Sequence, residues 1–211
     1  MIHDSVTEVM SAACPWLVMV LCLQLVAGWC GLTWRGWRLL VSSGAIALIF
    51  LLLPVKGLMI ARWVAGVSAN FSIPLTGIVA IAVWERTFTR RFFSPADWVT
   101  VWSFGAIGGV VLYPLALGAS SFDPYEWGWR FSPLFVIIGA LTSWLIWKQN
   151  RFGFLLLIAA VAFQLRLLES SNYWDYLLDP IYCLVGLVWS CGRLVAHIRG
   201  GVGRSTRPAA T

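Results

Sequence analysis

Two segments of the chain concentrate the side chains that could bind or transform a polar ligand. Residues 120–130 and 166–180 together hold five of the nine acidic residues, interspersed with Tyr and Trp. Carboxylates beside aromatic faces suit sugars, amines or a divalent cation, and paired carboxylates can act as general acid and base. The candidate binding residues are Asp123, Glu126, Trp127, Arg130, Glu169, Asn172, Trp174, Asp175 and Asp179.

These residues also have a structural interpretation. Asp123 and Asp179 each precede a proline, a pattern typical of a helix cap. Arg166 and Glu169 are spaced to pair on one helix face, whereas Asp175 and Asp179 would repel each other on such a face unless a cation lay between them. The second segment is therefore the stronger half of the candidate site, and no residue is assigned a catalytic role.

The cysteines and histidines do not indicate a metal ion or a cofactor. The five cysteines form no CxxC pair, and His3 and His197 are expected on opposite sides of a membrane. Cys14 and Cys183 could form a disulfide if their helices touch, but packing as small apolar side chains is the alternative. We expect neither a bound metal nor a cofactor.

The composition requires that lipid surrounds the elements carrying these residues. The chain is 60% hydrophobic and only 11% charged, with a mean hydropathy of +0.81, whereas soluble domains are about 45–50% apolar and about 25% charged. In lipid only helices and closed barrels satisfy the backbone, and the continuous apolar runs favour helices. The sequence predicts an all-α, polytopic transmembrane helix bundle.

Charged residues divide the apolar sequence into about seven spans. The expected spans are residues 13–32, 39–60, 63–84, 98–118, 132–148, 152–168 and 179–197. Cap-proline pairs mark helix starts at Ser94-Pro95, Ser132-Pro133 and Asp179-Pro180, and Asp123-Pro124 should begin a short helix. Pro54, Pro74 and Pro114 should kink helices. Gly105 and Gly109 predict close packing, within the chain or in a dimer.

The distribution of charge predicts the orientation. Cytoplasmic segments carry the excess of Lys and Arg. With the N-terminus outside, eleven of the 15 basic residues fall inside: Arg35, Arg38, Arg86, Arg90, Arg91, Lys148, Arg151, Arg193, Arg199, Arg204 and Arg207. Trp residues gather at both predicted interfaces. The expected location is therefore a bacterial-type inner (cytoplasmic) membrane, crossed several times, with the C-terminus in the cytoplasm.

The chain is expected to form one transmembrane helical domain, residues 1–198, followed by a disordered basic cytoplasmic tail, residues 199–211. The net charge of +6 is dispersed over the inner segments, so anionic lipid rather than nucleic acid is its expected partner. The bilayer and a membrane-protein partner are the interactions we expect.

The topology resembles that of rhodopsins. Retinal-binding families carry a lysine in the seventh helix, and here lysine occurs only at 56 and 148. The resemblance is therefore one of topology alone.

Three functions are compatible with these features. The first is a non-enzymatic accessory or scaffold component of a cell-envelope assembly or export system, favoured by the small size and short loops. The second is a small transporter or flippase for a polar or lipid-linked solute, in which Asn70 and the prolines would take part. The third is an outward-facing enzyme on a lipid-linked substrate, which requires the outer carboxylates to converge in one pocket.

Overall fold

The computed structural model describes residues 2–68 and 70–205. Within that part of the chain the regular structure is helical apart from one two-stranded antiparallel hairpin, so the predicted all-α class is confirmed. In chain order the elements are α1 (Ile2–Trp29), α2 (Trp37–Leu52), β1 (Pro54–Val55), β2 (Leu58–Met59), α3 (Ile60–Val67), α4 (Ile73–Phe88), α5 (Pro95–Pro114), the π-helical turn η1 (Leu115–Ala119), the 3₁₀ helix η2 (Pro124–Gly128), α6 (Pro133–Trp147), α7 (Phe152–Gln164), α8 (Tyr173–Leu177) and α9 (Pro180–Ser205).

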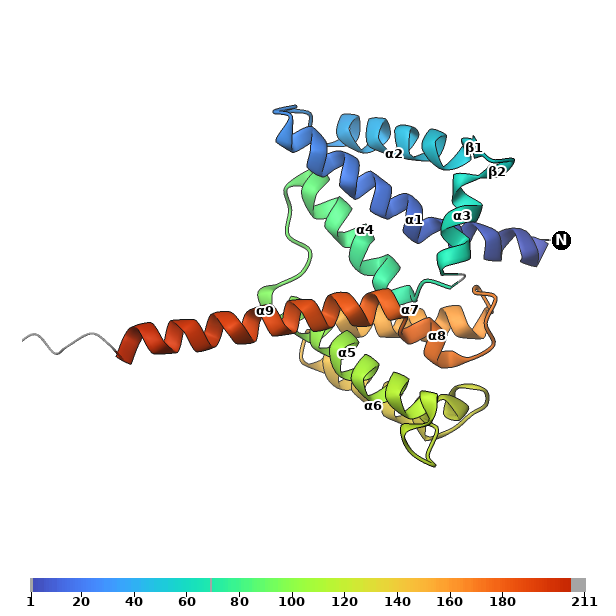
Figure 1. Cartoon of the computed structure of the whole chain (residues 1–211), viewed down its shortest axis with the longest axis vertical. Helices are drawn as coiled ribbons and strands as arrows, with labels where there is room; N and C mark the ends of the chain where they lie inside the picture. Colours follow the sequence, from blue (N-terminus) through green and yellow to red (C-terminus); the bar gives the residue numbers. More distant parts are fainter. Residues whose placement is uncertain (1, 69, 206–211) are drawn as a thin grey trace, which may run out of the picture.

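The elements form two groups (Figure 1). Helices α1 to α4 make one group and α5 to α9 the other, and α9 extends well past the remaining helices. Helix α4 joins the groups because it packs against α1 on one side and against α7 and α8 on the other. A cluster of aromatic rings forms part of the main core, with Phe135, Phe163, Tyr173 and Tyr176 at centroid separations of 4.6–5.5 Å.

Three helices in the described residues are long and apolar enough to cross a membrane. They are Val6–Trp29, Pro95–Ala119 and Pro180–Arg199. Helices α2, α6 and α7 are apolar but shorter. The long helices expose large apolar side chains, such as Ile107 on α5 and Val188 on α9. This is the surface expected of helices that face lipid.

The cap-proline pairs begin helices where the sequence predicts. Ser94 and Asp97 form a reciprocal capping box at the start of α5, with the Asp97 carboxylate accepting from the Ser94 N–H at 2.7 Å and the Ser94 hydroxyl accepting from the Asp97 N–H at 3.1 Å. The Ser132 hydroxyl accepts from the Leu134 N–H at 3.2 Å. Proline fits the first turn of a helix because a backbone N–H at that position would have no acceptor within the helix, so proline loses no hydrogen bond there.

The predicted spans 39–60 and 63–84 are divided differently in the structure. Helix α2 ends at Leu52, and a hairpin follows whose turn places Lys56 and Gly57 at φ 51° and 82°. Residues 68–72 then separate α3 from α4. The prediction that Pro54 and Pro74 kink helices is wrong, because Pro54 lies in β1 and Pro74 occupies the first turn of α4.

Two further features lie nearer the C-terminus. Pro114 is the last residue of α5, where the chain passes into the π-helical turn η1. Helix α9 continues to Ser205, into the segment predicted as a tail, and residues 206–211 lie outside the described residues.

Helices α5 and α9 approach closely through small residues on both. A Cβ atom at Gly105 would lie 2.9 Å from the Tyr182 ring, and one at Gly109 would lie 2.5 Å from Cys183. Gly186 of α9 faces backbone rather than a side chain, since its Cβ would lie 2.8 Å from the carbonyl oxygen of Trp102. The glycine pair of α5 therefore serves packing within the chain.

Replacing Gly186 with Ala should destabilise the bundle, because the new methyl group would meet backbone atoms of α5 that cannot rotate aside. We expect a loss of about 1–3 kcal/mol, seen as a lower apparent Tm in detergent. Gly192→Ala on the same helix is the matched control, since its Cβ would have no described atom within 4 Å and alanine favours the helix. Equal losses in both variants would contradict the packing argument.

Candidate functional site

The two predicted polar segments meet through η2 and α8. The Asn172 Nδ2 donates to the Tyr125 carbonyl oxygen at 3.0 Å, and the Trp174 indole N–H donates to the Pro124 carbonyl oxygen at 2.8 Å. Asn172 is fully buried, and its Oδ1 accepts from the Trp174 N–H at 2.9 Å, which caps α8. A Cβ at Gly128 would overlap this Oδ1 at 1.7 Å, so glycine is required where η2 contacts Asn172.

Asp175 is held by two hydroxyl groups. Both of its carboxylate oxygens lie 3.0 Å from the Tyr125 hydroxyl, and Ser170 donates to Oδ2 at 2.5 Å. Burial and the neighbouring Asp175 charge raise the pKa of Tyr125 above its ordinary value, so the phenol stays protonated and donates. Asp175 therefore joins η2 to α8.

Asp179 joins the start of α9 to the start of α4. Asp179 is buried, with 2% of its surface exposed. Its Oδ2 accepts from the N–H and the hydroxyl of Ser72 at 3.0 and 2.6 Å, and its Oδ1 accepts from the Tyr182 N–H at 2.9 Å. The capping interpretation of Asp179 is confirmed. The predicted repulsion from Asp175 on one helix face is wrong, because α8 ends at Leu177, between them.

The remaining predicted residues of the first segment lie in and around η2. Asp123 accepts from the Tyr125 N–H at 2.8 Å and caps η2, which confirms the expectation that it caps a helix. Trp127 is half-buried and its ring lies edge-on to Phe122 at 5.2 Å. Glu126 and Arg130 are exposed.

Glu169 lies apart from the other carboxylates. Its N–H donates to the Asn70 Oδ1 at 3.2 Å, and its exposed side chain lines a groove of about 570 Å³ that also includes Glu8 and Arg62. The predicted pairing with Arg166 on a helix is wrong, because α7 ends at Gln164 and Arg166 has a φ of 51°.

The structure thus brings the two segments together but directs their carboxylates into separate contacts. Asp123, Asp175 and Asp179 each accept hydrogen bonds from protein donors that define a helix start or an interhelical contact. This use favours a structural role over acid–base chemistry. Among the residues that the structure describes, no three His, Cys, Asp or Glu side chains lie together as a metal site requires.

Ser72→Ala should be costly, because it removes the hydroxyl that donates to the buried Asp179 carboxylate. Hydrogen bonds to charged groups contribute about 1.5–3 kcal/mol, and we expect a loss in that range, measured by thermal unfolding in detergent. Ser143→Ala is the control, since its exposed hydroxyl donates to the Gly139 carbonyl oxygen of its own helix. A Ser72 variant as stable as the control would refute the anchoring role of Asp179.

Tyr125→Phe should lower stability at pH 7 by about 1–2 kcal/mol, because Asp175 loses a donor. Since folding raises the pKa of Tyr125, the protonated phenol contributes fully below the unfolded value of about 10, and its contribution is lost as the pH rises above that value. The fall in apparent Tm between pH 9 and 11 should therefore be smaller in the variant.

Tyr173→Phe is the control for the Tyr125 variant. Burial raises the pKa of Tyr173 to about 12 without a nearby carboxylate. Its removal should also reduce the alkaline fall, yet leave stability at pH 7 nearly unchanged. If both variants were equally stable at pH 7, the hydrogen bond between Tyr125 and Asp175 would contribute nothing to the free energy of unfolding.

A second candidate site lies at the other end of α4. A cavity of about 700 Å³ opens between α1, the start of α2 and the end of α4, with residues 31–35 along one side. The Gly36 N–H donates to the Thr87 carbonyl oxygen at 2.9 Å, which holds this loop beside α4. Leu21, Leu25, Leu32, Leu39, Ala27 and Ala82 supply the apolar part of the lining.

Gln24 is the buried polar residue of this cavity. Only 1% of it is exposed, and its Nε2 donates to the Thr87 hydroxyl at 3.0 Å and, at a longer 3.4 Å, to the Ser43 hydroxyl. Its Oε1 has no hydrogen-bond partner among the described residues. Such an acceptor costs about 1–3 kcal/mol unless a donor reaches it.

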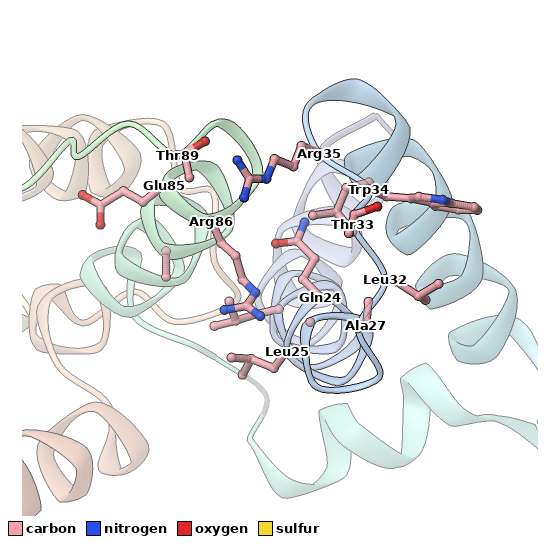
Figure 2. Close-up of a pocket in the computed structure, with 15 residues that line it drawn as sticks. Gln24, Leu25, Ala27, Leu32, Thr33, Trp34, Arg35, Glu85, Arg86 and Thr89 are labelled. Carbon is pink, nitrogen blue, oxygen red and sulfur yellow. The ribbon is translucent and has the colours of Figure 1, made fainter.

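Two arginines add positive charge to the same cavity. Figure 2 shows Arg35, Arg86 and Gln24 extending into the space between α1 and α4. Glu85 also lines the cavity, but its carboxylate points away from these three side chains. The Glu85 Oε1 accepts from the N–H groups of Phe92 and Phe93 at 2.6 and 2.8 Å, which explains its direction.

Sequence reasoning did not assign this cavity. Gln24 is visible in the sequence as a polar residue within a predicted span, but Arg35 fits the charge expected of an inner loop, and Glu85 and Arg86 fit a solvated helix end. The cavity could not be predicted because Gln24, Arg35 and Arg86 come from three separate elements, namely α1, the following loop and α4.

Comparison with known proteins adds no assignment: the chain matches no protein-family model, no curated protein and no solved structure.

Proposed function

We propose that this chain crosses a bacterial-type inner membrane seven times, with the N-terminus outside and the C-terminus in the cytoplasm. The passages would be α1, α2, α4, α5, α6, α7 and α9, with α3 and the hairpin at the outer surface. The sorting of basic residues supports this orientation.

The hydrogen bonds between loops support the same topology. Ser72, at the start of α4, contacts Asp179, and Tyr125 contacts Asp175, so three segments assigned to the outside lie together. At the other end Gly36 contacts Thr87, and the Arg151 N–H donates to Asp97 at 3.1 Å, which pairs segments assigned to the inside.

The function that the geometry favours is that of a non-enzymatic accessory or scaffold component of a cell-envelope assembly or export system. The observation that carries it is the far part of α9. Residues 191–199 are exposed on every side and project beyond the other helices (Figure 1). Leu194, Val195 and Ile198 share one face of this helix.

That face suits a membrane-protein partner. An exposed apolar stripe on a helix that extends past its own bundle is a surface that a second helix can bury. Arg193, which points away from this stripe, and His197 and Arg199, which border it, would remain available to acidic side chains or lipid headgroups. The structural use of Asp123, Asp175 and Asp179 favours this role over that of an outward-facing enzyme.

A photocrosslinking amino acid at position 194 or 198, introduced into the full-length protein in cells, should give one discrete protein adduct. The same amino acid at position 107, which is equally exposed on α5, should give lipid adducts alone. The partner should remain bound after detergent extraction and be lost when Leu194 and Ile198 are both changed to Asn. Equal crosslinking from positions 107 and 194 would contradict the scaffold role.

A small transporter or flippase is the second candidate, because the cavity at Gln24 offers a binding volume on one side of the bundle. In that role the cavity would have to open toward the α8 end during a transport cycle. Movement of a fluorescent lipid across vesicles containing the protein would distinguish this function from a scaffold.

A further inference from the structure

We propose that the cavity between α1, α2 and α4 binds the headgroup of an anionic phospholipid-type amphiphile, with a phosphate diester between Arg35 and Arg86 and an adjacent hydroxyl group at Gln24. This site is independent of the partner surface on α9, so either proposal can fail without the other.

The shape and lining select an amphiphile. A volume of about 700 Å³ lies within the range of roughly 300–1,000 Å³ that small-molecule sites occupy, and a lone phosphate would leave most of it unfilled. Apolar side chains such as Leu21, Leu25 and Leu39 line much of the cavity. They suit the glycerol and upper acyl portions of a lipid.

The charges select an anion. Arg35 and Arg86 extend into the cavity, while Glu85 is engaged by the backbone of the α4–α5 loop (Figure 2). Guanidinium groups bind phosphate oxygens through short, charge-assisted hydrogen bonds. Arg86 also lies directly against α1, since a Cβ at Gly28 would be 2.4 Å from its Nη2, and the absence of a side chain there admits the guanidinium.

Gln24 selects the group beside the phosphate. Its Oε1 is an acceptor that protein atoms cover in this structure. A ligand therefore meets it only when the amide turns toward the cavity, and the group it meets must be a donor such as a hydroxyl rather than a phosphate oxygen. Its position is held from the other side by the hydroxyl of Thr87 on α4. A headgroup with a hydroxyl next to its phosphate, as in a glycerol phosphodiester, satisfies both the arginines and this buried acceptor.

The test measures binding of short-chain lipids to the full-length protein in an uncharged detergent. The probes are phosphatidylglycerol, which has both anion and hydroxyl; phosphatidylmethanol, which has the anion alone; and phosphatidylcholine, which has neither net charge nor donor. We expect phosphatidylglycerol to bind most tightly and phosphatidylcholine least. Glycerol phosphate and inorganic phosphate should bind at least about tenfold more weakly, because they leave the apolar lining exposed.

The variants compare two arginine pairs of equal charge. Arg35→Gln with Arg86→Gln should weaken phosphatidylglycerol at least about tenfold. Arg38→Gln with Arg90→Gln removes the same charge nearby, from exposed residues outside this cavity lining, and should leave binding nearly unchanged.

Four outcomes would overturn the proposal or one of its parts. Equal weakening by the two variant pairs would mean diffuse attraction rather than a site. Equal binding of phosphatidylglycerol and phosphatidylmethanol would refute the role of Gln24. Equal binding of phosphatidylcholine would refute the anion requirement, and equal binding of inorganic phosphate would identify a free anion as the ligand.

Discussion

The bundle depends on a carboxylate that is buried between two helix starts. Asp179 accepts hydrogen bonds from the N–H and hydroxyl of Ser72 and from the N–H of Tyr182. A carboxylate without such donors in an apolar interior costs several kcal/mol. The contact is therefore satisfied only if α4 and α9 begin side by side, although 107 residues separate the two partners. Ser72 itself is extended, at φ −62° and ψ 149°, and in this conformation both of its donors reach the carboxylate.

Further features follow from the position of α4. With its first residue placed beside α9, its length brings Thr87 beside α1 and the loop that follows it, where Thr87 accepts hydrogen bonds from Gln24 and Gly36. The cavity at Gln24 and the contact between Ser72 and Asp179 thus lie at opposite ends of α4. Helix α3 lies outside this alignment and contacts α1 and α2 instead.

The fold could be predicted where the signal is local. The helix class follows from composition, and the starts of α5 and α6 follow from a cap residue before proline, because both effects act within one turn. The division of residues 39–84 could not be predicted in this way. Apolar character continues from α2 through α4, and the partner of Ser72 at the start of α4 is Asp179, which is distant in the sequence. The position of Pro74 could not be predicted for the same reason, since the sequence alone does not distinguish a proline that kinks a helix from one in its first turn.

The candidate site shows the same division. The meeting of η2 with α8 brings together most of the residues selected for their chemistry, such as Asn172, Trp174 and Asp175, but their hydrogen bonds show a structural use that residue type alone does not reveal. The cavity at Gln24 illustrates the reverse case. In the sequence, Arg35 and Arg86 look like the basic residues that any cytoplasmic segment carries. Only the folded arrangement places them around the buried amide of Gln24.

Helix α9 has a mechanical consequence. Its 26 residues span roughly 39 Å at 1.5 Å per residue. It is anchored at Asp179, clamped along α5 by Gly105, Gly109 and Gly186, and unsupported beyond residue 190. A continuous helix held in this way behaves as a lever, in which a small rotation at the clamped end becomes a larger displacement at the projecting end. The position of residues 191–199 therefore follows directly from how α9 packs along α5, with no other helix of the described chain to correct it.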